Sequence, residues 1–458
     1  MPSDMMNGQR MDKSKIAAKT DLKRSLRMGD TTLLVIGSVF GSGIFLTTGI
    51  VAERLPYSGL IWLAWAAGGI VTIIGALCYG ELGGLFPKAG GPYVYLQKAY
   101  GRAAAFSFGW TFFWIIGGGG IAALAVGFAD YAEALWPGMP RPAAAVFALA
   151  VMTALNSAGV VVGSRVQGAL TVVRIASIAA LVVGAVVVVA KTGNQHLSPF
   201  WPSATNSFSW TAFGTALIAV FWSYDGWYAV NCTAEEIRSP GKTIPLSLVL
   251  GTTAVLVLYL AANVVYSITV PMSRMVGLVR IGEASAASLF GASNGIVFAA
   301  VIALAILGCL GANILFCARV PFAMARDGLF FPILGRVHPR SAVPLNALAA
   351  QMIWASLLCL SGTYEELIEF VMFAAVLFYA ATAAAVVVLR KKDPEASRPY
   401  RVWGYPILPA AYVIFNLALV IALIVEKPLP SLAGAGFILL GGPAFLLWRK
   451  KESRCPRA

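Results

Sequence analysis

The chain has 458 residues, of which 59% are hydrophobic and 12% are charged. Soluble globular domains carry about 25% charged residues, so this composition excludes an ordinary soluble protein. The formal net charge of +14 would suit a nucleic-acid-binding protein, but that class needs basic residues clustered with aromatic residues on one water-facing surface. Here the basic residues lie between apolar segments, so we expect no nucleic-acid partner.

Apolar segments of about 20 residues, the length that crosses a hydrocarbon core ~30 Å thick, recur along the whole chain. They predict a polytopic all-α protein embedded in a lipid bilayer. The polar tail that precedes them contains no apolar run, so we expect a cytoplasmic tail and not a cleavable signal peptide. The twelve expected spans are 31–52, 59–86, 103–128, 143–163, 167–190, 210–231, 246–270, 295–320, 344–361, 366–389, 405–425 and 430–448.

The basic residues are distributed unequally between the two sides of these spans. If the N-terminus is cytoplasmic, then the tail, the even-numbered connections and the C-terminal end hold 27 of the 34 Lys and Arg residues, and the outer connections hold six. Cytoplasmic loops of membrane proteins are enriched in Lys and Arg, so we predict that both termini are cytoplasmic. The remaining basic residue, Arg174, lies inside a predicted span.

Two predicted spans are interrupted by glycine at comparable places, GSG at 41–43 in the first and YDG at 224–226 in the sixth. Two five-span repeats would produce this separation. Unwound backbone is tolerated at membrane depth only where it lines a cavity, so the pair indicates a transporter site. The alternative is helix packing through small residues, and we assign the glycine run at 117–120 to packing or to a flexible kink.

An amino acid is a zwitterion, so its site must replace water around a carboxylate and an ammonium group or bear several kcal/mol of desolvation. An interrupted helix supplies both partners: free N–H groups at the new N-terminus attract the carboxylate, and free carbonyls at the old C-terminus accept from the ammonium. The segments VFGSGIF at 39–45 and FWSYDGW at 221–227 offer such backbone, with a hydroxyl at Ser42 and a carboxylate at Asp225.

Five motifs also occur together and in order. They are GSGIF in the first span, YGELGGLFPKAGGPYVYL at 79–96, YDGW followed by AEEIRSPGKTIP at 234–245, ARVPFAMARDGLF at 318–330, and LRKKDPEASRPYRVWGYP at 389–406. From about residue 25 onward, the chain resembles the L-amino-acid transporter branch of the amino acid-polyamine-organocation superfamily. The resemblance implies a LeuT-type fold of two inverted five-helix repeats plus two further helices, and transport of L-amino acids.

The chain is expected to form one transmembrane domain at 31–448, between a cytoplasmic N-terminal tail at 1–30 and a cytoplasmic C-terminal tail at 449–458. This division follows from the apolar segments together with the implied fold. Inside the domain we expect the first inverted repeat at 31–190, the second at 210–389, and helices 11 and 12 at 405–448.

The resemblance implies a substrate site between spans 1, 3, 6, 8 and 10. Carried over by motif, the backbone of Ser42, Gly43 and Ile44 faces the substrate carboxylate. Asn313 matches a family asparagine that joins a polar network near the site, with interhelical packing as the alternative. The carbonyl groups implied to face the substrate amine belong to Val39, Trp222, Ser223 and Asp225, and Trp222 occupies the position of an aromatic gate.

Asp225 is a carboxylate at predicted mid-membrane depth, where an ionised group is costly and functional by default. Many relatives have glycine here and carry neutral substrates, whereas the animal light chain that moves cationic amino acids and cystine has an aspartate in a similar setting. Cationic substrates are therefore one alternative. The other is structural, because an aspartate at a helix break can cap the half-helix that follows.

Arg174 stands where related carriers usually have a lysine, which takes the place of a sodium ion and braces the unwound first helix. Arginine keeps the charge, so we expect sodium-independent exchange or facilitated uptake, with proton coupling through Asp225 or Glu81 as the alternative. A purely structural alternative is that Arg174 snorkels to the cytoplasmic interface. Glu81, Glu235 and Glu236 are expected near the cytoplasmic face with arginines at 319 and 326, as a gate network or as solvated interface residues.

No HExxH or Walker-type motif is present, and the chain has two histidines. We therefore expect no enzymatic activity, catalytic residue, metal site or cofactor. A polyamine permease and a non-transporting amino acid sensor are the rival functions. Animal light chains bind a glycoprotein subunit through a cysteine between spans three and four. Residues 129–142 contain no cysteine, so we expect a carrier without a disulfide-linked heavy chain. We expect this stand-alone carrier in a plasma membrane, of prokaryotic type.

Overall fold

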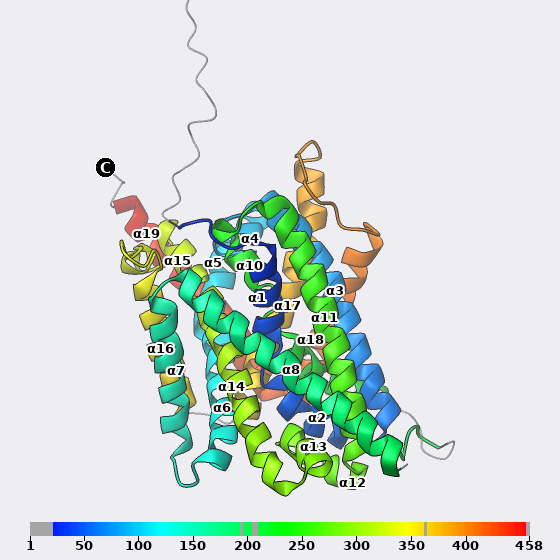
Figure 1. The fold of residues 1–458 in the computed structure, drawn as a ribbon. Coiled ribbons are helices and arrows are strands. Elements are labelled where there is room, and N and C mark those ends of the chain that lie inside the picture. Colours follow the sequence, from blue (N-terminus) through cyan, green and yellow to red (C-terminus); the bar gives the residue numbers. More distant parts are fainter. Residues whose placement is uncertain (1–21, 193–195, 204–208, 361–363, 455–458) are drawn as a thin grey trace, which may run out of the picture.

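The computed structural model describes residues 22–192, 196–203, 209–360 and 364–454. Within these ranges the regular secondary structure is helical, apart from one isolated bridge between Leu26 and Ile237. The helices run mostly along one direction and form a single bundle (Figure 1). Most of the predicted N-terminal tail, and the last residues of the C-terminal tail, lie outside the described residues.

The first half of the chain contains eight α-helices and a π-helical segment, η2. They are α1 (Met28–Val39), α2 (Gly43–Arg54), α3 (Ser58–Leu85), α4 (Pro92–Tyr100), α5 (Arg102–Thr111), η2 (Phe112–Gly117), α6 (Gly118–Leu135), α7 (Arg141–Ser157) and α8 (Val160–Thr192).

The second half begins with another interrupted helix and ends with two helices at the edge of the bundle. Its elements are α9 (Trp210–Tyr224), α10 (Ala229–Cys232), η3 (Ala234–Glu236), α11 (Pro240–Thr269), α12 (Met272–Met275), α13 (Ile281–Phe290), α14 (Ala292–Cys317), α15 (Arg319–Arg326), η4 (Pro332–Gly335), α16 (Leu345–Cys359), α17 (Tyr364–Lys392), α18 (Ile407–Glu426) and α19 (Pro428–Arg454).

The prediction of a helical membrane protein is confirmed. Among the described residues, nine helical stretches are long and apolar enough to cross a membrane, and α7 and α16 are shorter apolar helices. The sixth predicted span is the 15-residue helix α9 followed by a break. All predicted apolar segments fall on helices, while their number, twelve, stays a prediction.

Local chemistry explains several helix boundaries. Pro240 starts α11, a position where its missing N–H costs nothing. The predicted boundary at 163 is wrong, because α7 ends at Ser157 and α8 already begins at Val160. Gly159 lies between them at φ +133°, a conformation that favours glycine and separates the two helices.

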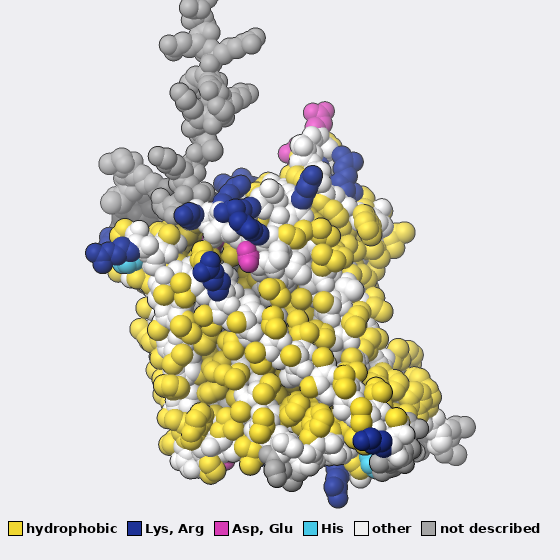
Figure 2. All heavy atoms as spheres, in the orientation of Figure 1, with side chains coloured by type: hydrophobic (Ala, Val, Ile, Leu, Met, Phe, Trp, Pro, Cys, Tyr) yellow, Lys and Arg dark blue, Asp and Glu magenta, His cyan; other side chains and the backbone are white. Residues whose placement is uncertain are grey.

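The first and third predicted spans lie at the centre of the bundle. The most apolar windows of Met28–Arg54 and Arg102–Leu135 are each 94% buried, whereas that of Pro428–Trp448 is 22% buried. Figure 2 shows hydrophobic side chains covering the flank of the molecule and Lys and Arg mostly at one end. In a membrane this flank contacts lipid, so the exposed apolar surface needs no protein partner.

Candidate functional site

The first span is interrupted where the sequence predicted it. Helix α1 ends at Val39 and α2 begins at Gly43. A methyl group at Gly41 would lie 2.4 Å from the Cys309 sulfur, and one at Gly43 would lie 2.7 Å from the Ser223 Cα. The glycines therefore serve both functions that the sequence left as alternatives, because they release the helix and also let it pack closely on α14 and α9.

The sixth span is interrupted directly beside the first. Helix α9 ends at Tyr224 and α10 begins at Ala229. Between them Gly226 has φ +90°, and a methyl group there would lie 2.6 Å from the Ser38 carbonyl oxygen. The Ser38 hydroxyl donates to the Gly226 carbonyl at 2.9 Å. Two breaks almost 190 residues apart in sequence are therefore joined by a hydrogen bond.

A small cavity lies where the breaks meet, with a volume of about 20 Å³. This is room for roughly one water molecule, so the site would need to widen to hold an amino acid. Of the eight predicted binding residues, Ile44 does not line the cavity and is buried in the first turn of α2. The predicted residues that do line the cavity are Val39, Ser42, Gly43, Trp222, Ser223, Asp225 and Asn313.

Three of the carbonyl groups implied to face an amine already have partners inside the protein. The Tyr259 hydroxyl lies 2.9 Å from the Val39 oxygen and 2.8 Å from the Ser223 oxygen. The Trp222 carbonyl accepts from the N–H of Asp225 at 3.0 Å. Each carbonyl oxygen keeps a second lone pair for a substrate. Sequence reasoning missed Tyr259, because no motif marks this tyrosine of α11.

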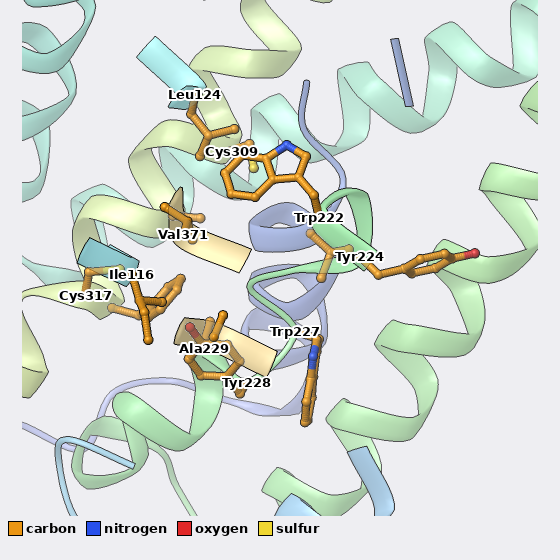
Figure 3. Close-up of a cluster of buried hydrophobic side chains, with 14 of the residues drawn as sticks. Ile116, Leu124, Trp222, Tyr224, Trp227, Tyr228, Ala229, Cys309, Cys317 and Val371 are labelled. Atoms are coloured by element: carbon orange, nitrogen blue, oxygen red, sulfur yellow. The ribbon is translucent and has the colours of Figure 1, made fainter. Parts of the chain in front are cut away.

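Asn313 and Trp222 connect the breaks to the surrounding helices. The Asn313 side-chain amide donates to the Ser38 carbonyl at 3.1 Å and to the Cys309 carbonyl at 3.0 Å, so it holds the end of α1 against α14. Figure 3 shows the indole ring of Trp222 beside Leu124 and Cys309. Both neighbours line the cavity, which places an aromatic ring at the wall where a substrate side chain would lie.

Asp225 accepts a hydrogen bond from the Tyr379 hydroxyl of α17. The residue at the start of α10 is Tyr228, and no side-chain capping bond is made there. This leaves capping by the Asp225 carboxylate a prediction. The carboxylate also joins the sixth span to the tenth, within a group of aromatic rings that includes Tyr228 and Tyr379, 5.7 Å apart.

Arg174 lies in the bundle interior with no exposed surface. One of its guanidinium nitrogens, Nη1, donates to the carbonyls of Gly37 and Phe40 at 2.7 Å and 2.5 Å. Gly37 lies in the last turn of α1 and Phe40 directly follows the helix, where carbonyls lose their helical partners at the break. The snorkelling alternative is wrong, because the side chain turns inward to these carbonyls and not toward the interface.

The glycine run at 117–120 divides into packing and cavity positions. A methyl group at Gly118 would lie 2.5 Å from Trp354, and one at Gly119 would lie 2.6 Å from Val371. A methyl group at Gly120 would lie 4.0 Å from the Trp222 side chain, and Gly120 lines the cavity. Packing therefore does not describe Gly120, while the flexible kink stays a prediction. Only the tertiary arrangement separates Gly120 from its neighbours.

The predicted gate residues form separate clusters instead of one network. Glu81 pairs with Arg390 at 2.6 Å and with Arg398 at 3.3 Å, and it accepts from the Val402 N–H at 2.7 Å. Its side chain is 2% exposed, so solvation at an interface does not describe it. The two arginines were missed, since they lie about 310 residues further along the chain.

The second cluster joins Glu236 of η3 to Arg319 of α15. Two parallel bonds of 2.8 Å and 3.2 Å connect the carboxylate with the guanidinium, and both side chains are almost completely buried. Glu235 and Arg326 form a looser, more exposed pair at 3.8 Å. These pairs connect the segments that follow the sixth and eighth predicted spans.

A family model described as amino acid permease matches residues 26–447. The human b(0,+)-type amino acid transporter 1 is 27% identical over 415 residues, covering 89% of this chain and 84% of that protein. The serine/threonine exchanger SteT of Bacillus subtilis (strain 168) is 32% identical over 393 residues, covering 85% and 88%. The human large neutral amino acids transporter small subunit 2 is 28% identical over 442 residues, covering 94% and 82%.

Proposed function

Because this chain belongs to the amino acid permease family, we propose that it moves L-amino acids by alternating access through the cavity between its two interrupted helices. The convergence of both breaks on one cavity carries the proposal. The first turn of α2 starts at Gly43 and offers free N–H groups to a carboxylate. The last turns of α1 and α9 offer carbonyl oxygens to an ammonium group.

The proposed architecture is two inverted five-helix repeats followed by α18 and α19, twelve spans in all. Its support is the mutual packing of the interrupted helices, α1 against α10 and α2 against α9, as expected when two broken helices lie antiparallel. We also propose that both termini face the cytoplasm of a cell whose plasma membrane holds the protein. The gathering of Lys and Arg at one end supports this orientation (Figure 2).

Substitution at Gly43 tests the transport site. The variant Gly43→Ala places a methyl group 2.6 Å from the Ser223 side chain, and overpacking of ~1–3 kcal/mol would slow leucine counterflow into proteoliposomes about tenfold. Gly214→Ala is the matched control, because nothing lies within 4 Å of a methyl group at this position of α9. Equal counterflow by both variants would show that substrate does not pass between the breaks.

Counterflow by the wild-type protein with putrescine but not with leucine would instead identify a polyamine permease.

Transport is proposed to be independent of sodium, because the Arg174 guanidinium already supplies a cation to the carbonyls of Gly37 and Phe40. Uptake into proteoliposomes should differ by less than about twofold between sodium and choline buffers. A coupling free energy of about 1.4 kcal/mol between sodium and substrate would produce a tenfold difference. Stimulation by sodium beyond that range contradicts the proposal. An acidic external pH that accelerates uptake would favour proton coupling.

Asp225 is proposed to admit cationic amino acids alongside neutral ones. Asp225→Asn keeps the side-chain size but removes the charge, so arginine uptake should fall about 10- to 100-fold relative to leucine uptake, the range for a lost charged hydrogen bond. Tyr379→Phe is the companion variant, since it removes the hydroxyl that contacts Asp225 and leaves the charge. Equal losses for arginine and leucine in Asp225→Asn would assign the carboxylate a structural role only.

Gly120 is proposed to leave space for the substrate side chain. Gly120→Val should lower the kcat/KM for leucine about tenfold more than that for alanine, because a filled pocket rejects the larger side chain by ~1–3 kcal/mol. Gly119→Val provides the comparison, since its side chain would collide with Val371 and not enter the cavity. That variant should lose protein stability without changing the leucine-to-alanine ratio.

The protein is proposed to work without a disulfide-linked partner. Residues 129–142 contain no cysteine, and the cysteines within the described residues are buried. Purified protein that migrates identically with and without reductant, and transports after reconstitution alone, would agree with this.

A further inference from the structure

A second cavity, of about 450 Å³, lies at the end of the bundle where α1 begins. Residues 23–30, the start of α8 and Arg238 surround it. Figure 2 shows Lys and Arg side chains gathered at this end of the molecule. Four basic residues line the cavity, against one acidic residue, Asp30. The basic residues are Lys23, Arg27, Arg165 and Arg238.

These four cations are brought together from three segments of the chain. The isolated bridge holds the N-terminal segment, because the Leu26 N–H donates to Glu236 at 3.0 Å and the Arg238 N–H donates to Leu26 at 2.9 Å. This places Lys23 and Arg27 beside Arg238. The first turns of α8 contribute Arg165.

The cavity carries uncompensated positive charge. Across the part of the chain that the structure describes, none of the four basic side chains makes an ion pair. The Asp30 carboxylate is itself engaged, since it accepts from the Arg27 N–H at 2.9 Å. Helix α1 also begins here and adds the partial positive charge of its N-terminus. An anion is the ligand that would relieve this repulsion.

The surroundings of the cavity show which kind of anion fits. Next to Arg165, α8 exposes Val161 by 43% and Val162 by 41%, and further along it exposes Val172 by 58%. Within a bilayer these valines contact acyl chains. A ligand that touches both surfaces needs an anionic group at one end and apolar chains at the other.

We propose that this cavity binds the headgroup phosphate of an anionic phospholipid, whose chains lie along the exposed valines of α8. The bound phosphate bridges α8, the N-terminal segment and Arg238. That segment contacts Glu236 through its backbone, so the lipid stabilises the closed arrangement of this end. Transport by the reconstituted protein then depends on anionic lipid as well as on substrate.

Binding is tested on the full chain in detergent by native mass spectrometry, with titration by phosphatidylglycerol or phosphatidylcholine. The wild-type protein should retain phosphatidylglycerol in preference to phosphatidylcholine. Arg165→Ala and Lys23→Ala should each weaken phosphatidylglycerol binding about fivefold, and the double variant about 25-fold, as expected per basic residue near a charged lipid. Lys23 lies outside the helices, so its variant reports on binding even if Arg165→Ala unfolds.

Lys88→Ala is the matched control, because Lys88 is exposed in a connection and does not line the cavity. Its affinity should equal that of the wild type. Loss of affinity in Lys88→Ala equal to that in Arg165→Ala would overturn the proposal in favour of general attraction of the basic end. Retention of both lipids equally would also overturn it. Inorganic phosphate that displaces phosphatidylglycerol at equal concentration would overturn the lipid assignment and identify a free-phosphate site.

Discussion

Replacing Arg319 with methionine is expected to destabilise the protein by about 3–5 kcal/mol, because Glu236 is then left charged and unpaired in a buried position. Glu236 is 0% exposed and Arg319 is 1% exposed, and two parallel hydrogen bonds join them. The loss is measured as a fall in melting temperature of the purified protein, followed by tryptophan fluorescence. Combining Arg319→Met with Glu236→Gln should recover most of it, since no buried charge remains.

The pair between Glu235 and Arg326 provides the control for this experiment. Its atoms are 3.8 Å apart and the Arg326 side chain is 31% exposed, so Arg326→Met should cost less than about 1 kcal/mol. Equal losses in the two methionine variants would mean that the buried pair contributes no more than a surface pair.

The position of the Glu236–Arg319 pair also suggests how it affects transport. It joins η3, directly after the sixth predicted span, to α15, which follows the eighth. In the proposed alternating-access cycle, opening of this end separates these segments. We therefore expect the double variant Arg319→Met/Glu236→Gln to regain stability but to show altered exchange kinetics, because it lacks the ion pair that joins these two segments.

Arg174→Met is expected to reduce uptake about 10- to 100-fold while the protein still folds. The variant removes the charged donor from the carbonyls of Gly37 and Phe40, and a lost hydrogen bond to a charged group costs ~1.5–3 kcal/mol. The methionine also removes two guanidinium nitrogens that have no hydrogen-bond partner. The variant therefore has fewer unpaired buried polar atoms and still folds, but the end of α1 loses its hydrogen bonds to the guanidinium group.

Arg174→Lys separates charge from geometry, because an ammonium group keeps the charge on a shorter side chain. It should transport better than Arg174→Met. Lys191→Met, at the exposed end of the same helix, should leave uptake unchanged. Wild-type uptake by Arg174→Met would show that the broken end of α1 needs no cation, and the explanation for sodium independence would fail with it.

Much of the candidate site was predictable because its determinants are local. A glycine that releases a membrane helix, and a carboxylate inside an apolar run, are visible within a few residues. For this reason Ser42, Gly43 and Asp225 were expected at the site and do line its cavity. Ile44 was carried over with its motif for its backbone, which lies in the first turn of α2; Ile44 does not line the cavity, and its contact with a substrate stays a prediction.

The residues that sequence reasoning missed act across long separations. Tyr259 contacts a carbonyl 220 residues away, and Arg390 contacts a carboxylate 309 residues away. Neither residue lies in a pattern that reports its partner. Gly120 was missed for a different reason, since it and Gly119 look alike in the sequence and only their orientation in α6 distinguishes them.

The sequence and the tertiary structure explain different features of the two interrupted helices. Hydropathy and glycine placement determined that this chain is a helical membrane protein with two breaks, because apolar length and helix propensity are properties of short segments. Only the tertiary structure decided that the breaks dock on one another, that Arg174 supports the first and that Tyr379 holds Asp225 at the second. Those contacts depend on how distant helices pack, which no local pattern encodes.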